Sequence, residues 1–147
     1  MAHALTAAAV VQEARAWIGT PYRHQASLKG VGCDCLGLVR GVWRALYGAE
    51  PEPVPPYAPD WAEAARGEPL AEAAFRHMVA IDCASFGAGD VLLFRWRPGL
   101  PAKHAAIATA PDRMVHAHDG AAVAEVALMP WWRRRLAFAF RFPGVTG

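Results

Sequence analysis

The hydrophobic pattern of this 147-residue chain changes its period about halfway along the sequence. Up to residue 77 apolar residues recur at helical spacing, and after residue 87 short apolar runs alternate with turn residues. Helical segments followed by a series of strands predict an α+β fold, with N-terminal helices packed on an antiparallel β-sheet. The length and the 54% hydrophobic content suit one compact core, so we expect a single domain over residues 1–147.

Four segments have apolar residues at helical spacing. They are residues 7–18, Cys35–Tyr47, 61–66 and 69–77. Thr6 and Asp34 are residues of the kind that cap helix N-termini, and Gly48 supplies a C-terminal stop. The polar segment 23–32 contains two glycines and is predicted to be a loop over the start of the second helix. Five prolines between residues 51 and 59 favour extended backbone at the surface.

The second half of the chain predicts five strands. They are residues 91–94, 104–109, 114–118, 123–126 and 136–142. If the second and third of these turn around Ala110, then His104 and His116 lie at equal distances from the turn and face each other. Opposed side chains on one face of a sheet are about 5 Å apart at Cβ, so His116 could orient the ring of His104. His118 would lie diagonally, at about 7–8 Å, and ranks below His116 for this role.

Cys35 lies in the first turn of the second predicted helix, directly after the N-cap Asp34. Unpaired backbone N–H groups and the helix dipole stabilise an anion at this position. Beside a cationic partner, such a placement lowers the pKa of a thiol from about 8.5 to about 3.5–7.5. The pattern therefore predicts a nucleophilic thiolate, for which a histidine oriented by a third polar group is the usual partner.

The other two cysteines do not indicate a disulfide framework. A bridge between Cys33 and Cys35 would span a single residue and be strained, and the total of three cysteines is odd. We expect Cys83 to be a core residue. Cys33 is expected to be a packed loop residue. The alternatives are a resolving thiol and half of a metal site, although the C-x-C pair lacks the usual spacing of a structural zinc site.

Composition disfavours two classes of partner. The net charge of +2 is too small to indicate nucleic acid binding, although it would tolerate an anionic polymer such as the cell wall. The apolar run at residues 7–11 is too short to span a membrane and lacks the preceding basic residue of a signal peptide. We therefore expect synthesis in the cytoplasm.

Five short motifs occur in a fixed order and carry a resemblance to a known family. They are Gly19-Thr20-Pro21-Tyr22, Gly32-Cys33-Asp34-Cys35-Leu36-Gly37-Leu38-Val39, Gly89-Asp90-Val91-Leu92-Leu93-Phe94, His104-Ala105-Ala106-Ile107 and Met114-Val115-His116-Ala117. Together they resemble the ordered signature of the NlpC-type cysteine peptidases, which have a papain-like fold. Within that family the chain looks closest to the short peptidases encoded with phage tails and gene transfer agents.

The resemblance implies a role for each matching residue. Cys35 is the nucleophile, His104 the base and His116 the orienting third residue. Tyr22 matches a tyrosine near the oxyanion and the substrate backbone. Asp34 is assigned with Tyr22 to the substrate and oxyanion side, although helix capping already accounts for it. The sequence departs from the family at Leu36, where a serine usually follows the nucleophile.

The implied activity is hydrolysis of peptidoglycan stem peptides, typically between D-glutamate and a diamino acid. The resemblance implies neither a metal nor a cofactor. It also implies a place in a phage-like particle that acts on the periplasmic cell wall, with tail or baseplate proteins as partners. Two alternatives remain: a structural tail component with little turnover, and an acyltransferase or amidase on the same scaffold.

One further motif has no assigned role. Residues 131–135 read Trp-Trp-Arg-Arg-Arg and pair aromatic rings with consecutive positive charge. This pattern is typical either of core tryptophans beside solvated arginines or of a surface that docks onto a larger assembly. Nucleic acid binding is the less favoured interpretation.

Overall fold

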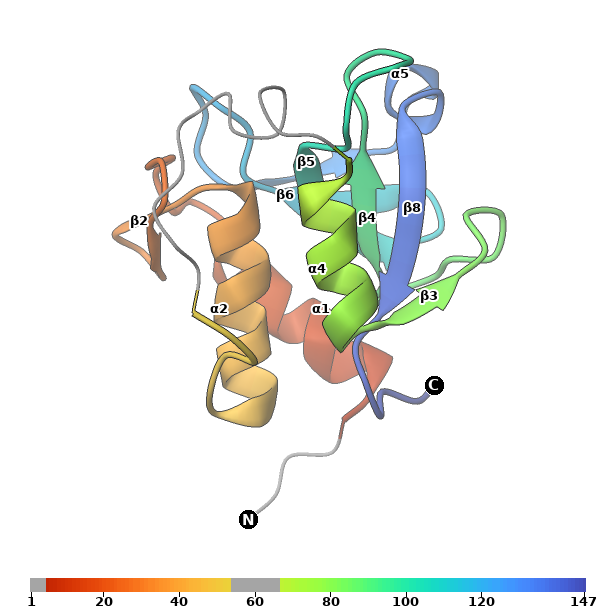
Figure 1. Cartoon of the computed structure of the whole chain (residues 1–147). Coiled ribbons are helices and arrows are strands. Elements are labelled where there is room, and N and C mark those ends of the chain that lie inside the picture. Colours follow the sequence, from red (N-terminus) through yellow and green to blue (C-terminus); the bar gives the residue numbers. More distant parts are fainter. Residues whose placement is uncertain (1–4, 54–66) are drawn as a thin grey trace.

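The structure is a computed structural model that describes residues 5–53 and 67–147 (Figure 1). Its helices are α1 (Ala7–Ala16), α2 (Cys35–Tyr47), α4 (Pro69–His77) and α5 (Pro130–Arg133). Its strands are β1 (Ser27–Leu28), β2 (Gly32–Cys33), β3 (Val79–Ile81), β4 (Val91–Phe94), β5 (His104–Ala110), β6 (Arg113–His116), β7 (Ala124–Ala127) and β8 (Leu136–Arg141). The helix predicted at residues 61–66 and the prolines beyond residue 53 lie outside the described residues.

Six of the strands form one sheet in the order β3-β8-β4-β5-β6-β7. Each neighbouring pair in this sheet is antiparallel, which confirms the predicted α+β class with an antiparallel sheet. The edge strand β3 was not predicted, because it has three residues, follows α4 directly and is mostly exposed. Strands β1 and β2 form a small separate hairpin within the segment predicted as a loop.

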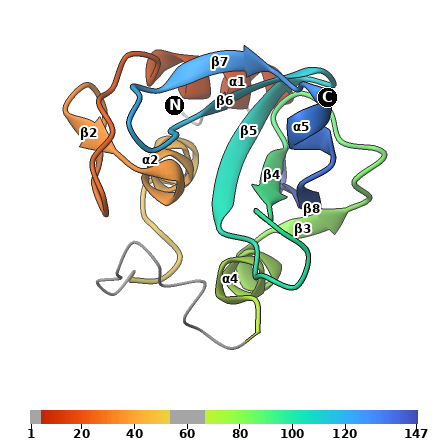
Figure 2. The same ribbon diagram turned by 90° about the horizontal axis from the view of Figure 1, so that it is seen from above.

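Side chains of the central strands alternate between two faces, and each face has its own core. Val91 and Leu93 of β4 pack in one cluster with residues of α1 and α2. Leu92 and Phe94 pack on the opposite face, where Trp132 of α5 joins them. Figure 2 shows α2 and α5 on opposite sides of β4 and β5. A strand buried on both faces has a continuous apolar run, which is the pattern that predicted β4.

The helices α1 and α2 approach each other closely because of one glycine. A Cβ atom at Gly41 of α2 would lie 2.0 Å from the ring of Trp17, which caps the C-terminal end of α1 and is buried. The indole of Trp17 therefore occupies the space that any other residue at position 41 would need. This packing seats α2 against β5 and α1.

The predicted bounds of α2 and α4 are confirmed, whereas α1 is shorter than predicted. Thr6 caps α1 as expected, since its hydroxyl accepts a hydrogen bond from the N–H of Ala9 at 3.1 Å. The helix ends at Ala16, because the N–H of Ile18 bonds to the carbonyl of Arg15 in a tighter final turn. Ile18, predicted for the apolar stripe, is consequently 46% exposed.

The register predicted for the β5–β6 hairpin is wrong by two residues. The observed pairs are Ile107 with Val115 and Ala108 with Met114, so the turn is centred one residue later than Ala110. A bulge after Ala108 accompanies the turn. If this register is continued, position 116 faces position 106 rather than position 104, and β6 ends at residue 116 rather than 118.

Candidate active site

Cys35 is the first residue of α2, and Asp34 fixes the start of this helix. The Asp34 side chain is buried, with its Oδ1 accepting a hydrogen bond from the N–H of Gly37 at 2.7 Å. Its Oδ2 accepts a second one from the N–H of Gln25, also at 2.7 Å. One carboxylate therefore caps the helix and ties the preceding loop to it. The structure shows Asp34 as the N-cap that the sequence predicts.

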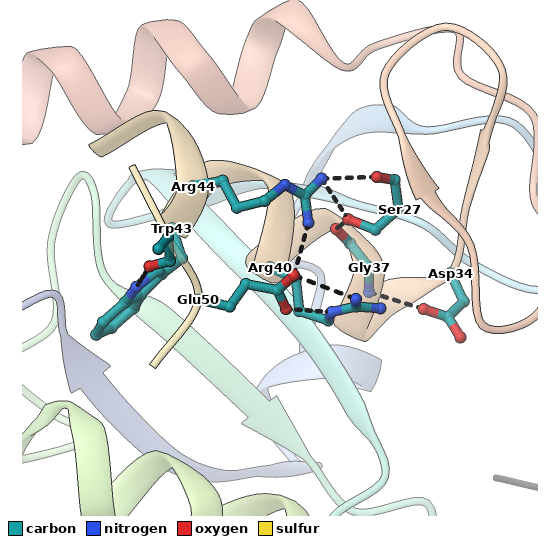
Figure 3. A network of polar contacts seen from close by, with 8 residues as sticks. Ser27, Asp34, Gly37, Arg40, Trp43, Arg44 and Glu50 are labelled. Atoms are coloured by element: carbon teal, nitrogen blue, oxygen red, sulfur yellow. Dashed lines mark hydrogen bonds and ion pairs between the residues drawn. The ribbon is translucent and has the colours of Figure 1, made fainter. Parts of the chain in front are cut away.

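The loop before β1 lies directly against the first turn of α2. A Cβ atom at Gly37 would lie 1.9 Å from the carbonyl oxygen of Ala26, so only glycine allows this approach. The hydroxyl of Ser27 donates to the Gly37 carbonyl oxygen at 2.6 Å. Figure 3 shows the guanidinium of Arg44 donating to Ser27 and pairing with Glu50. This network holds one wall of the site in place.

The two predicted histidines meet despite the shifted register. His104 is the first residue of β5 and His116 the last of β6, and both are buried. The Nε2 atom of His104 lies 2.8 Å from Nδ1 of His116, which is a hydrogen bond between the rings. The side chains reach each other diagonally across the hairpin, with their ring centroids 5.1 Å apart.

His118 and two tryptophans complete an aromatic cluster around this pair. The ring of His118 stacks on His116 at 5.7 Å and lies 5.6 Å from His104, although His118 itself is exposed. Trp132 stacks on His104 at 5.3 Å and meets His116 edge-on at 5.1 Å. Trp96, which follows β4, also stacks on His104 at 5.3 Å. Sequence reasoning did not assign either tryptophan to the site.

Cys35 and His104 line one cavity of about 270 Å³. The thiol of Cys35 lies 3.7 Å from the carbonyl oxygen of Lys103, the residue before His104. Tyr22 lines the same cavity from the opposite loop. A sulfur at a helix start and an imidazole from a distant strand thus face a shared space, with His116 behind the imidazole.

The protonation states differ from the thiolate that the sequence predicts. Burial raises the pKa of the Cys35 thiol to about 12, and the nearby Asp34 acts in the same direction. The backbone N–H groups of Ala105, Leu36 and Cys35 oppose this shift because they stabilise the thiolate, but burial outweighs them. The pKa of the Cys35 thiol is therefore shifted upward, opposite to the direction that the sequence predicts.

The histidines are shifted toward their neutral forms. Burial, followed by the charges of His116 and His118, holds the pKa of His104 well below its ordinary value of 6.5. Burial and His118 lower the pKa of His116 to about 4. Burial also raises the pKa of Tyr22 above its usual range, with Cys35 contributing. At neutral pH these shifts favour a thiol at Cys35, neutral rings at His104 and His116, and a neutral phenol at Tyr22.

The remaining cysteines have packing roles. All three cysteines are free thiols; Cys33 is fully buried, and Cys83 packs partly buried against the second core. Within residues 5–53 and 67–147, no three His, Cys, Asp or Glu side chains are grouped so that they could hold a metal ion. Over the same part of the chain, every helix is too short or too polar to cross a lipid bilayer.

Comparisons with known proteins bear on the family and the fold of this chain. A sequence model described as the NlpC/P60 family matches residues 19–141. The structure is similar to the NlpC/p60 domain of the peptidoglycan hydrolase SagA, with a TM-score of 0.63 and 25% identity over 93% of this chain and 99% of that one. The predicted papain-like NlpC-type fold is thereby confirmed.

Longer proteins contain similar domains. An NlpC/P60 family protein from Bacillus cereus has a TM-score of 0.67 and 21% identity, over 93% of this chain and 40% of that one. A lipoprotein-like NLP/P60 family protein from Staphylococcus aureus has a TM-score of 0.62 and 22% identity, over 96% of this chain and 42% of that one. The chain therefore spans about two-fifths of these two proteins. Comparison with curated protein sequences found no match.

Proposed function

The chain belongs to the NlpC/P60 family, and we propose that it is a cysteine peptidase that hydrolyses the peptide part of peptidoglycan. Cys35 is the proposed nucleophile and His104 the proposed general base. The observation that carries this proposal is the shared cavity lined by Cys35 and His104, with His104 hydrogen-bonded to His116 behind it. Nucleophile, base and orienting group are the minimal set for thiol-based acyl transfer.

The hydrogen bond between the histidines assigns the nitrogens of His104. Its Nε2 atom is engaged with Nδ1 of His116, which leaves Nδ1 of His104 to accept a proton. This requires the tautomer in which His104 carries hydrogen on Nε2 and donates it to His116. His116 is therefore a positioning residue, since it selects the tautomer and the ring orientation of the base.

Acylation begins from the neutral pair. The thiol gives its proton to Nδ1 of His104 as the sulfur attacks the scissile carbonyl carbon, and a tetrahedral oxyanion forms. The C–N bond then breaks, the His104 imidazolium gives its proton to the departing amine, and a thioester remains on Cys35. In deacylation His104 takes a proton from water, the hydroxide attacks the thioester, and carboxylate and thiol are released.

Tyr22 and Asp34 have supporting roles in this proposal. Because burial keeps the Tyr22 phenol protonated, its hydroxyl is a donor that faces the cavity and would stabilise the oxyanion. Both Asp34 oxygens are occupied by backbone N–H groups. Asp34 lines the same cavity, and in this proposal it positions the turn that carries Cys35.

The proposal also specifies which bond is cleaved and in which biological setting the protein acts. From the motif resemblance we assign the bond between D-glutamate and the diamino acid, and a role in cell-wall penetration by a phage-like particle. Digestion of muropeptides of defined composition, followed by mass analysis, identifies the bond. Copurification of this chain with tail or baseplate proteins from phage-like particles tests the biological setting. Particles that do not contain the chain would contradict that setting.

The activity test compares the protein with two variants on soluble peptidoglycan fragments. We expect new amine termini from the native chain, none from Cys35→Ala, and normal cleavage by Cys83→Ala, a cysteine remote from the cavity. Reaction in ¹⁸O-water distinguishes the alternatives, because hydrolysis places ¹⁸O in the new carboxylate. An acyltransferase would give products without ¹⁸O, and a structural protein would give no products; either result would contradict the proposal.

A further inference from the structure

A second groove, of about 590 Å³, adjoins the cavity that contains Cys35. It lies between the loop after β4 and the segment that joins α5 to β8, and four of its lining residues are arginines: Arg95, Arg97, Arg134 and Arg135. Among the described residues, its lining includes no carboxylate. Figure 1 shows the β4–β5 loop and α5 at the same end of the molecule as the start of α2.

Among the residues that the structure describes, carboxylates pair with few of the arginines in this groove. Glu68 pairs with Arg95. Within residues 5–53 and 67–147, neither Arg97 nor Arg134 has a carboxylate within ion-pair distance. Three of the four groove arginines therefore have no carboxylate partner within the described part of the chain.

One of the arginines is held in a fixed orientation. The guanidinium of Arg135 lies 3.7 Å from the ring centroid of Trp131, and its Nη1 donates to the Trp131 carbonyl oxygen at 2.8 Å. Trp131 is 43% exposed. An aromatic ring that holds a guanidinium by a cation–π contact reduces the entropy lost when that guanidinium binds an anion.

Trp96 connects the groove to the catalytic cavity. It lines both spaces, and its ring stacks on His104 at 5.3 Å. The ring of Trp131 lies 6.1 Å from Trp96 on the groove side. A substrate whose scissile bond reaches Cys35 would therefore extend over Trp96 toward the arginines.

We propose that this arginine groove is a substrate subsite that binds an anionic group next to the scissile bond. Guanidinium groups match carboxylate and phosphate oxygens with paired hydrogen bonds, so either anion fits. Peptidoglycan stem peptides carry free carboxylates, and some walls carry phosphodiester polymers. The inference rests on the proposed peptidase function, because the anion is placed relative to the bond that Cys35 attacks.

The kinetic test uses the double variant Arg97→Ala with Arg134→Ala, both at exposed positions. Arg76→Ala with Arg113→Ala removes the same charge from exposed arginines outside the groove and is the control. For a stem-peptide fragment with free carboxylates, we expect KM to rise about tenfold in the groove variant with kcat within about twofold. The amidated fragment should be turned over equally by native, groove and control proteins. An unchanged KM for the carboxylate fragment would rule out a carboxylate as the bound anion, and an unchanged affinity for untreated sacculi as well would overturn the proposal.

Binding measurements keep this test separate from the peptidase proposal. Cys35→Ala protein is titrated with the labelled carboxylate fragment, with sacculi stripped of phosphodiester polymer, and with untreated sacculi. Loss of affinity for the carboxylate fragment in the groove variant supports the subsite even if no fragment is cleaved. A groove effect confined to untreated sacculi identifies phosphate as the anion. If the groove variant lost affinity only for a short DNA duplex, the wall subsite would be refuted.

Discussion

The buried histidine pair predicts that this protein loses stability in mild acid. Burial and His118 lower the pKa of His116 to about 4, whereas an unfolded chain has the ordinary value near 6.5. Between these two pH values the unfolded state binds more protons than the folded state, so the free energy of unfolding falls as the pH falls. The stabilisation is complete above about pH 6.5 and is lost on the way down to about pH 4.

The size of the effect follows from the same two pKa values. Where the unfolded state binds one proton more than the folded state, each pH unit changes the free energy of unfolding by about 1.4 kcal/mol. Protonation of His116 alone therefore accounts for a loss of about 3 kcal/mol. His104 is shifted in the same direction and adds to this loss. A typical domain has about 5–15 kcal/mol of stability, so the loss is a large share of the total.

The assay is urea unfolding at a series of pH values from about 7 to about 5, where carboxyl groups with ordinary pKa values of about 3.9–4.3 stay mostly ionised. Glu125, whose pKa Arg15 lowers to about 2, contributes below this range. We expect His116→Gln to be less stable than the native chain at pH 7 but to have a shallower pH dependence. Gly87→Ala, which changes no titratable group and has open space around it, should keep the native slope. Equal slopes in His116→Gln and the native chain would refute the reasoning.

Two further substitutions test the packing around the site. Gly37→Ala would place a methyl group 1.9 Å from the Ala26 carbonyl oxygen, so we expect a loss of about 1–3 kcal/mol in urea unfolding, against almost none for Gly87→Ala, which has open space around it. Trp132→Ala removes the ring that packs on His104, so we expect kcat to fall about tenfold and the acid limb of the pH–rate profile to move. Trp132→Phe should restore most of the activity, and equal kcat in the Ala variant and the native chain would contradict this role.

The local sequence was sufficient to predict a helix or strand where residues at its two ends mark where it begins and stops. The helix α2 has a capping aspartate, apolar residues at helical spacing and a terminal glycine with φ of +89°, and its predicted bounds are confirmed. The strand β4 is a continuous apolar run between turns, and it was found for the same reason. By contrast, α5 is a four-residue turn at Pro130 with no side-chain cap, so it gives almost no periodic signal.

The candidate site residues could be selected from the sequence, whereas the packing around them could not. Cys35 and His104 follow from motifs that the sequence carries in order, and the structure brings both to one cavity. The hairpin register depended on which residue centres the turn, and local sequence did not determine it. Trp96 and Trp132 join the histidines from two separate segments, so their contribution depends on tertiary contacts that spacing does not encode.

Two opposing effects at the start of α2 determine the direction of the pKa shift at Cys35. The first turn of α2 supplies N–H groups from Cys35 and Leu36 that stabilise a thiolate, as the sequence indicates. Packing that turn against β5 also removes water from the sulfur, and this desolvation is the larger effect. Burial also lowers the pKa of His104, so both shifts favour the neutral pair over a thiolate–imidazolium ion pair. In the proposed mechanism the sulfur therefore starts as a thiol and gives its proton to His104 as it attacks the substrate carbonyl.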